Sequence, residues 1–443
     1  MFDPVNEPSF RLDVAGLSDA FEVLAFTGRE AISEPFVFDV DLLIEDPTLD
    51  LASLLYRSAS LHFGPAGNSV HGQLHELVQR DHGSPIRLCK VRIGPRLSCL
   101  SQRFSQRIFS SRSVPQILDQ VLKEHGITGQ DRRFDLDDDY APRDFCTQYR
   151  ESDLQFVQRL CAQERLHYHF EHRAQGHCVV FGDGQGAFRT GEAAVFQAEG
   201  EQPAVRRFEV QRCVDKTTQS AESRTDLATL RSGQLLPLSG HPVSGSNQPW
   251  LLTHIEHQGS QDPDSPYSNR VCAIRWDVPF ESPHRAVKPN MNSLQRAWVV
   301  HVDEPRPDPR RPVAVQFDWL YQGEGATPSH CWLPLAPELQ AARGAQLSEG
   351  TEVVVSFIEG DPDQPLITGL LHSLKPDEAI EAADVSSQSA VDDCPPEGVE
   401  GWLRSGEPLL LLCLLPGGGS YNHCAQTLCT CRAATRLGQS GAA

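Results

Sequence analysis

The sequence has no long hydrophobic run and no excess of positive charge. The longest strictly apolar stretch is LLLLCLL, Leu409–Leu415, which is too short to cross a bilayer as a helix. The N-terminal MFDPVNEPSFRLDV has no basic segment followed by an apolar core, so we expect no secretory signal peptide. With 59 acidic and 39 basic residues, the formal net charge of −20 disfavours nucleic-acid binding. We therefore expect a protein made in the cytoplasm, with no integral membrane segment, whose export would bypass signal peptides.

Familiar catalytic motifs are also absent from the sequence. There is no H-E-x-x-H, no G-x-S-x-G and no Walker A loop. The segment Gly182–Gly186 reads GDGQG, but AFRTGEAAVF follows it instead of a helix. Because a phosphate-binding loop needs the positive end of a helix dipole, we interpret GDGQG as a hairpin turn. The sequence predicts no catalytic residue and no enzyme activity.

The pattern of apolar residues indicates a mostly β protein with some α (α+β). A length of 443 residues suggests two to four domains. FVFDVDL, Phe36–Leu42, alternates apolar and polar residues as a half-buried strand does. SVPQILDQVLKEHGI predicts a helix that begins after Ser113 and ends near Gly126, and DLQFVQRLCAQ predicts a second helix. Between and after these helices the pattern again favours strands and turns.

Residues 291–375 are predicted to form a separate five-stranded β-barrel. The five strand candidates are AWVVHVDE, RPVAVQFDWL, HCWLPL, TEVVVSFIEG and PLITGLLH, separated by Pro, Gly or charged turns. Five strands in a segment of this length favour a small OB-fold barrel. Residues 376–400 carry eight acidic residues and neither Lys nor Arg, which is typical of a solvated linker. Residues 401–443 have no useful helical period and form a short irregular C-terminal tail.

Three carboxylates lie close together in EGDPDQP, at Glu359, Asp361 and Asp363. The loop lacks the spaced oxygens, central Gly and terminal Glu of an EF-type calcium site. Proline fixes φ, Gly360 permits a sharp bend, and Asp side chains bond to nearby backbone amides. We therefore interpret the cluster as an architectural turn between two barrel strands.

Two groups of potential metal ligands need separate interpretations. LHYHFEHRAQGH contains four histidines, which we interpret mainly as exposed strand residues because no carboxylate or cysteine follows at a convincing spacing. They are His167, His169, His172 and His177.

The C-terminal tail holds the stronger metal candidate. Five of the 13 cysteines lie in the last fifty residues. One imidazole and three thiols, which suit Zn²⁺ or an Fe site, follow the flexible PGGGS. They are His423, Cys424, Cys429 and Cys431. The alternative is a set of reduced, partly buried thiols, since C-x4-C-x-C is not a standard zinc module.

The barrel segments carry a resemblance to a known family. RPVAVQFDWL, SHCWLPLAPE and EGTEVVVSFIEGDPDQPLITGLLHS resemble VgrG proteins, the spikes of the bacterial type VI secretion system. Upstream, FTGREAISEPFVFDVDL, RIFSSRSVPQILDQVL, YRESDLQFVQRLCAQERLHYHFEH and PWLLTHIEHQG are similar to the hub region of that family. The resemblance extends over roughly residues 8 to 375. One departure is Arg165, where the family usually has Gly.

The resemblance implies a fold, partners and a function. Residues 1–290 would form a phage-hub-like base of two β-barrel subdomains with helical insertions, and residues 291–375 an OB-fold spike domain. The chain would form a homotrimer on the Hcp tube and carry an effector, an adaptor or a PAAR-type tip protein into target cells. Residues 401–443 would be a tip or adaptor segment. Two alternatives remain open: a VgrG whose tail is a small toxin, and a phage- or pyocin-like baseplate hub.

Overall fold

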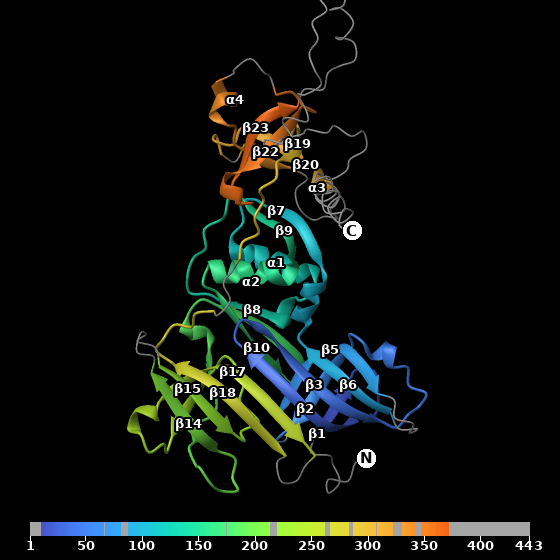
Figure 1. Ribbon diagram of the computed structural model, residues 1–443, viewed down its shortest axis with the longest axis vertical. Coiled ribbons are helices and arrows are strands. Elements are labelled where there is room, and N and C mark those ends of the chain that lie inside the picture. Colours follow the sequence, from blue (N-terminus) through green and yellow to red (C-terminus); the bar gives the residue numbers. More distant parts are fainter. Residues whose placement is uncertain are drawn as a thin grey trace, which may run out of the picture. The chain divides into compact units, whose positions relative to one another are not determined.

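The computed structural model describes residues 10–371, except 66, 81–86, 174, 213–218, 262–265, 283–286, 307, 322–329 and 342–346. The chain divides into two units, Met1–His372 and Ser373–Ala443. All described residues belong to the first unit (Figure 1). The predicted acidic linker and C-terminal tail lie outside the described residues. The boundaries predicted at residues 290 and 375 stay predictions.

Six strands close into the first barrel. They are β1 (Phe10–Val14), β2 (Phe21–Ala31), β3 (Glu34–Ile44), β4 (Ser58–Phe63), β5 (Ser69–Arg80) and β6 (Arg87–Gly94). Their order is β1-β4-β5-β6-β3-β2, all antiparallel, and β2 also pairs with β1, which closes the ring. The alternation predicted for Phe36–Leu42 is confirmed, because Phe36, Phe38 and Val40 are buried while their neighbours are not.

A second barrel follows from later strands. They are β13 (Ala194–Val195), β14 (Val205–Arg212), β15 (Gln219–Thr225), β16 (Gln234–Ser239), β17 (Pro249–Ser260) and β18 (Tyr267–Arg275). The order is β16-β17-β18-β15-β14, and a bridge between Phe196 and Val205 joins the end of β13 to β14. Since β13 pairs with β16, this ring closes too. Antiparallel pairing of β2 with β17 fuses the two barrels into one continuous sheet.

Two helices and two small sheets are inserted between the barrels in sequence. They comprise η2 (Arg96–Gln102), β7 (Phe104–Phe109), α1 (Val114–Glu124), β8 (Arg132–Asp135), β9 (Cys146–Ser152), α2 (Asp153–Gln163), β10 (His167–Arg173) and β11 (Gly176–Gly182). Both predicted helices are confirmed. Each begins with a capping box, in which Ser113 pairs with Gln116 and Ser152 with Gln155, so the first-turn amides are satisfied by side chains.

The GDGQG segment is not a hairpin turn, contrary to the sequence interpretation. After β11 the chain passes through the short helix η4 (Gln185–Ala187) into β12 (Arg189–Thr190). Strand β12 does not pair with β11; it pairs in parallel with β16. The segment therefore leads from the β10-β11-β8 sheet to the second barrel. The glycines indicated a bend, but the strand that follows them, β12, pairs with residues 45 positions further along the chain.

The C-terminal strands form a five-stranded antiparallel sheet. They are β19 (Gln295–Val299), β20 (Val313–Phe317), β21 (Cys331–Leu333), β22 (Glu352–Phe357) and β23 (Pro365–Leu371), with α3 (Asp318–Tyr321) and α4 (Pro337–Ala341) between them. The order is β21-β20-β19-β22-β23. A parallel bridge joins Leu335, which follows β21, to Ile367 of β23. The five predicted strands are confirmed, and the OB-type assignment of the sheet stays a prediction.

Candidate functional site

The loop between β22 and β23, residues 358–364, is the acidic turn singled out in the sequence. We call it the junction loop. The backbone N–H of Ile358 donates to the carbonyl of Gln364 at 3.0 Å, and that of Asp363 donates to Asp361 Oδ1 at 2.9 Å. Gly360 has φ +74°, and a Cβ there would lie 1.9 Å from Asn290 Oδ1. The loop is thus a close-packed turn, as predicted, and only glycine fits at position 360.

The junction loop also docks onto β9, which the sequence did not reveal. Thr147, a fully buried residue of β9, donates its backbone N–H to Asp363 Oδ1 at 2.6 Å. Its hydroxyl donates to the carbonyl of Pro362 at 2.8 Å. Lys288 Nζ forms ion pairs with Asp361 and, at 2.7 Å, with Asp363 Oδ2. The carboxylates therefore act as acceptors that fasten the C-terminal sheet to the preceding part of the chain.

Apolar packing continues this contact. Ile108, Phe145 and Tyr149, on or beside strands β7 and β9, belong to the same hydrophobic cluster as the core of the C-terminal sheet. The rings of Tyr149 and Trp319 meet edge to face, with centroids 6.3 Å apart. Because these groups are buried together, the C-terminal sheet and β7–β9 share one core. We call this shared contact, with the docked loop, the junction.

A buried ionic network lies behind β9. The side chain of Asp153, the first residue of α2, has no solvent exposure. Its Oδ1 accepts from Arg107 Nη2 at 3.0 Å and Gln148 Nε2 at 2.8 Å, and its Oδ2 contacts Arg103 and His125. Burial by itself raises the pKa of Asp153, but the hydrogen bond from His125 and the guanidinium groups together hold it well below its ordinary value. The network ties β7 and β9 to both helices.

A second buried pair supports the backbone carbonyl of the docked residue. Arg159 of α2 donates from Nη2 to the carbonyl of Thr147 at 2.9 Å and to Glu151 Oε1 at 2.6 Å. Burial raises the pKa of Glu151, while Arg159 acts in the opposite direction. Thr147 is therefore held on its amide side by Asp363 and on its carbonyl side by Arg159, which fixes the strand between loop and helix.

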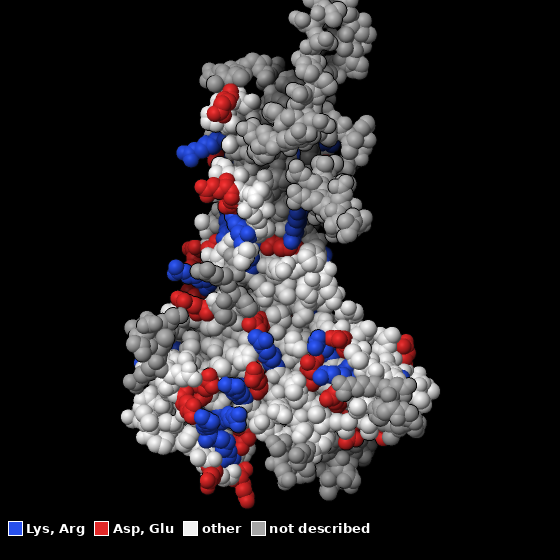
Figure 2. Space-filling model, viewed as in Figure 1, with Lys and Arg blue, Asp and Glu red and all other residues white. Residues whose placement is uncertain are grey.

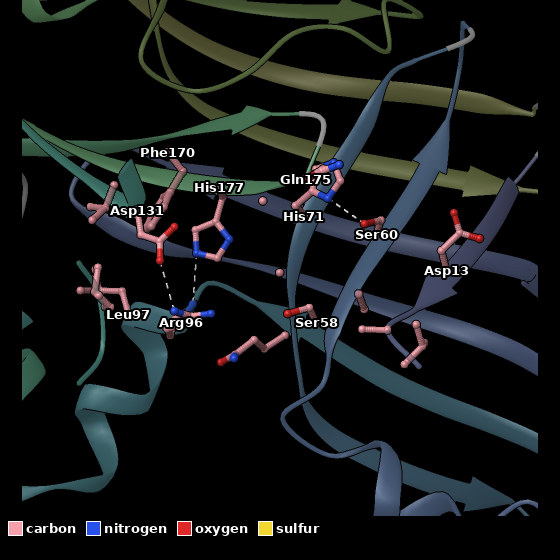
Figure 3. A pocket seen from close by; sticks show the side chains of 18 of the residues that line it. Asp13, Ser58, Ser60, His71, Arg96, Leu97, Asp131, Phe170, Gln175 and His177 are labelled. Carbon is pink, nitrogen blue, oxygen red and sulfur yellow. Dashed lines mark hydrogen bonds and ion pairs between the residues drawn. The ribbon is translucent and has the colours of Figure 1, made fainter. Parts of the chain in front are cut away.

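A polar pocket of about 320 Å³ lies elsewhere, lined by β1, β4, β5, β11 and η2 (Figure 3). Arg96 Nη1 pairs with Asp131 Oδ2 at 3.2 Å. Ser60 Oγ and His71 Nδ1 are 2.7 Å apart, the distance of a nucleophile and its base. The other nitrogen of His71 contacts the hydroxyl of Ser69 at 2.9 Å instead of a carboxylate. Because no acid orients the imidazole, the pair does not favour nucleophilic catalysis.

The four strand histidines are not exposed as expected. His167 and His169 are buried, and both rings pack against Phe188, with centroids at 4.2 and 5.5 Å. His172 and His177 are partly buried and turned toward Phe36, at 5.1 and 5.7 Å. Alternation in the sequence assigned faces correctly, but it could not show that other elements cover both faces. Among the described residues, no group of His, Cys, Asp or Glu is placed to hold a metal.

The tail candidates His423, Cys424, Cys429 and Cys431 lie outside the described residues. Zn or Fe binding there stays a prediction. Seven cysteines of the described ranges are free thiols, of which Cys99 and Cys272 are partly exposed and the others buried: Cys89, Cys99, Cys146, Cys161, Cys178, Cys272 and Cys331. None of the described helices combines the length and apolar character needed to span a lipid bilayer.

Charges on the visible face are mixed. Figure 2 shows Lys and Arg interspersed with Asp and Glu among the described residues. Many exposed charged side chains of the described residues are paired, as in Arg270 with Glu222 at 3.0 Å and Arg207 with Glu209 at 2.6 Å. Exposed pairs of this kind each contribute about 0–1 kcal/mol, so they serve solubility more than stability.

Comparison with known proteins shows that phage tail baseplate hub proteins share this fold of two fused barrels with inserted helices. Residues 29–214 match the family described as the phage tail baseplate hub (GPD). The fold is similar to that of the E. coli c3393 protein, described as a type VI secretion component, with TM-score 0.70 and 23% identity over 81% of this chain and 99% of that one. A Francisella PdpA–VgrG complex shares the fold with TM-score 0.54 and 7% identity, over 87% and 80%.

The sequence comparison is more specific. Two Pseudomonas aeruginosa type VI secretion system spike proteins, VgrG4b and VgrG5, are 33% and 34% identical, each over 84% of this chain. A Vibrio cholerae relative, named the actin cross-linking toxin VgrG1, is 26% identical over 82% of this chain and 41% of its own length. Over most of its length this chain is homologous to VgrG spike proteins. It spans 57% and 58% of the length of the two Pseudomonas proteins.

Proposed function

We propose that this chain is the hub and spike base of a type VI secretion system. Three copies would form a ring on the Hcp tube, with the C-terminal sheets gathered into the spike. The observation that carries the proposal is the junction, where the Thr147 amide, Asp363 and Lys288 join the sheet to the hub strands. A buried hydrogen bond backed by a shared core suits a part that must not bend when it is pushed.

The fused barrels support the ring arrangement. Each chain contributes two closed barrels joined by seven residue pairs between β2 and β17. Three copies related by a three-fold axis would present six barrels around one centre, with burial between chains supplying rigidity. Such a part needs no catalytic residue, so we propose that the hub and C-terminal sheet act without enzyme activity. Export through the type VI apparatus follows from the same proposal.

Stoichiometry tests this proposal directly. Sedimentation equilibrium of the full chain, at several concentrations, is expected to give three times the mass of 49.0 kDa. The trimer should co-purify with Hcp tubes, and a variant carrying Asp363→Ala should still trimerise through the hub. A stable monomer across the concentration series, with no retention on Hcp, would contradict the proposal.

We propose that the tail binds a metal ion or a partner protein. A tail that holds Zn or Fe through His423, Cys424, Cys429 and Cys431 would form a tip or adaptor segment that recruits an effector or tip protein. Elemental analysis of the full chain, prepared without chelator, should find metal that is lost in Cys429→Ser with Cys431→Ser and kept in the control Cys99→Ser. Equal metal content in all three would refute the site.

A toxin function of the tail is the second candidate, favoured by the relative that is named an actin cross-linking toxin. The toxin and adaptor hypotheses can be distinguished in recipient bacteria that produce either the full chain or a chain ending at residue 375. Growth arrest by the full chain alone would favour the toxin. Equal growth would favour the adaptor.

A further inference from the structure

Two histidines attach the β10–β11 hairpin to the first barrel through bonds that depend on their charge. His172 and His177 are direct cross-strand neighbours in this hairpin. The backbone N–H of His71 in β5 donates to His172 Nδ1 at 3.1 Å. The backbone N–H of Arg96 in η2 donates to His177 Nε2 at 3.2 Å (Figure 3). A ring nitrogen that accepts a hydrogen bond carries no proton, so both imidazoles are neutral in this arrangement.

Protonation would turn each acceptor into a donor. An imidazolium carries N–H on both nitrogens, which would place N–H against the backbone N–H of His71 or Arg96. The other nitrogen of His172, Nε2, is inaccessible to solvent and has no hydrogen-bond partner among the described residues. A charge on His172 would therefore be buried, with part of it unsatisfied, and both rings would still face the apolar ring of Phe36.

The surrounding charges do not remove this penalty. Glu30 of β2 favours a proton on His172, but Arg231 and the neighbouring His71 and His177 oppose it. Glu30 itself is engaged by Arg231 at 3.8 Å and His257 at 3.2 Å.

Around His177, the charged and titratable groups are Arg96, His71 and His75. Burial is the main cause that lowers the pKa of both histidines, to about 4 for His177 and well below the ordinary value for His172.

We propose that His172 and His177 form a proton-sensitive clasp, which holds the β10–β11 hairpin on β5 and η2 at neutral pH and releases it in acid. The hairpin forms one wall of the polar pocket, through Phe170, Gln175 and His177. Release of these two bonds would therefore open that pocket at the hairpin edge, while Phe170 and Val179 remain in the core that the hairpin shares with the first barrel. The clasp is independent of the proposed secretion function.

The sign of the effect follows from linkage. A histidine whose folded pKa lies below its unfolded value stabilises the closed form above about pH 6.5 and loses that contribution as pH falls toward the folded pKa. For a shift from 6.5 to about 4, the opening equilibrium of His177 alone rises about 30-fold at pH 5 and about 150-fold at pH 4. His172 adds to this in the same direction.

Amide hydrogen exchange of the full chain tests the clasp. Protection of the His71 and Arg96 amides, corrected for the chemical exchange rate at each pH, should fall between pH 6.5 and 4. The double variant His172→Asn with His177→Gln places an amide oxygen near each accepting nitrogen and cannot titrate there. It should keep protection at pH 4, whereas the control His301→Asn, at an exposed histidine, should behave as the parent.

Two results would overturn the clasp. One is a double variant with the same acid response as the parent. The other, which does not depend on the variants folding, comes from NMR of the parent with ¹³C-labelled imidazoles. His172 and His177 resonances should remain those of neutral rings down to pH 5. Titration of both near pH 6.5 in the folded protein would exclude the proposal.

Discussion

Replacement of Asp363 by Ala should loosen the junction. Asp363→Ala removes the acceptor of the buried Thr147 N–H and one partner of Lys288. An unsatisfied buried N–H costs about 1–3 kcal/mol, and a partly exposed ion pair adds about 0–1 kcal/mol. We expect a loss of about 2–3 kcal/mol in the free energy that holds the loop on β9. Asp363→Asn keeps an acceptor oxygen, so its loss should be smaller, about 1 kcal/mol or less.

Amide exchange at Thr147 measures this loss locally. Since about 1.4 kcal/mol corresponds to a factor of ten, protection of the Thr147 amide should fall about 30- to 150-fold in Asp363→Ala. The matched control is Asp303→Ala, because the Asp303 side chain is fully exposed and the change should alter stability by less than about 0.5 kcal/mol. Equal Thr147 protection in the two variants would refute the reasoning that the loop is fastened through its carboxylate.

Three further changes test other parts of the fold. Asp153→Asn should lower the free energy of unfolding by about 1–3 kcal/mol in urea at pH 7, because it removes the buried carboxylate that pairs with Arg103 and Arg107 and leaves Glu124 as their remaining anion. The pKa of Asp153 is lowered in the folded state, so its contribution is present above about pH 4 and lost below, and the difference between the two proteins should shrink toward pH 2. Arg165→Gly should raise the free energy of unfolding by about 1 kcal/mol, because Arg165 has φ +58°, a conformation that glycine adopts without strain. Gly28→Ala should destabilise by about 1–3 kcal/mol, since the new Cβ would lie 2.2 Å from the ring of Phe38.

Control variants and a pH series test the physical reason given for each of these three predictions. For the glycine change, Gly245→Ala introduces a Cβ with nothing within 4 Å and should leave the melting temperature unchanged. For the arginine change, Arg306→Gly alters a residue without positive φ and should not stabilise. A pH-independent difference for Asp153→Asn, or equal melting of Gly28→Ala and Gly245→Ala, would contradict the corresponding argument.

Helices and strands were predicted well from the sequence, because apolar periodicity, capping residues and turn residues are local properties of the chain. In α1, Ile117, Leu118, Val121 and Leu122 recur at helical spacing and are buried, and Ser113 forms a capping box with Gln116 at the predicted start of the helix. The five C-terminal strands were predicted from alternation and turn residues alone. Arg165 at a position where the family usually has Gly is matched by a left-handed backbone in the structure.

Contacts between segments that are distant in the chain could not be predicted from the sequence. Asp363 and Thr147 are 216 positions apart, and nothing in the composition of either segment indicates the other. The acidic turn was recognised as architectural, but its docking partner was not. The histidines of β10 were expected to be exposed because a strand alone leaves one face to solvent. Burial of that face depends on Phe188, which lies beyond β11 in the chain. The same dependence on tertiary neighbours hid the charge-sensitive bonds of His172 and His177.

The pairing of β2 with β17 has a practical consequence for the design of truncated fragments of this chain. Seven consecutive residues of β17, from His254 to Ser260, cover the outer edge of β2. A fragment that stops before residue 249 would keep the first barrel but leave that edge bare, and an uncovered row of amides and carbonyls invites pairing with other chains. Truncations placed between the two barrels should therefore yield fragments that self-associate. A truncation after residue 371 leaves every described strand with its neighbours.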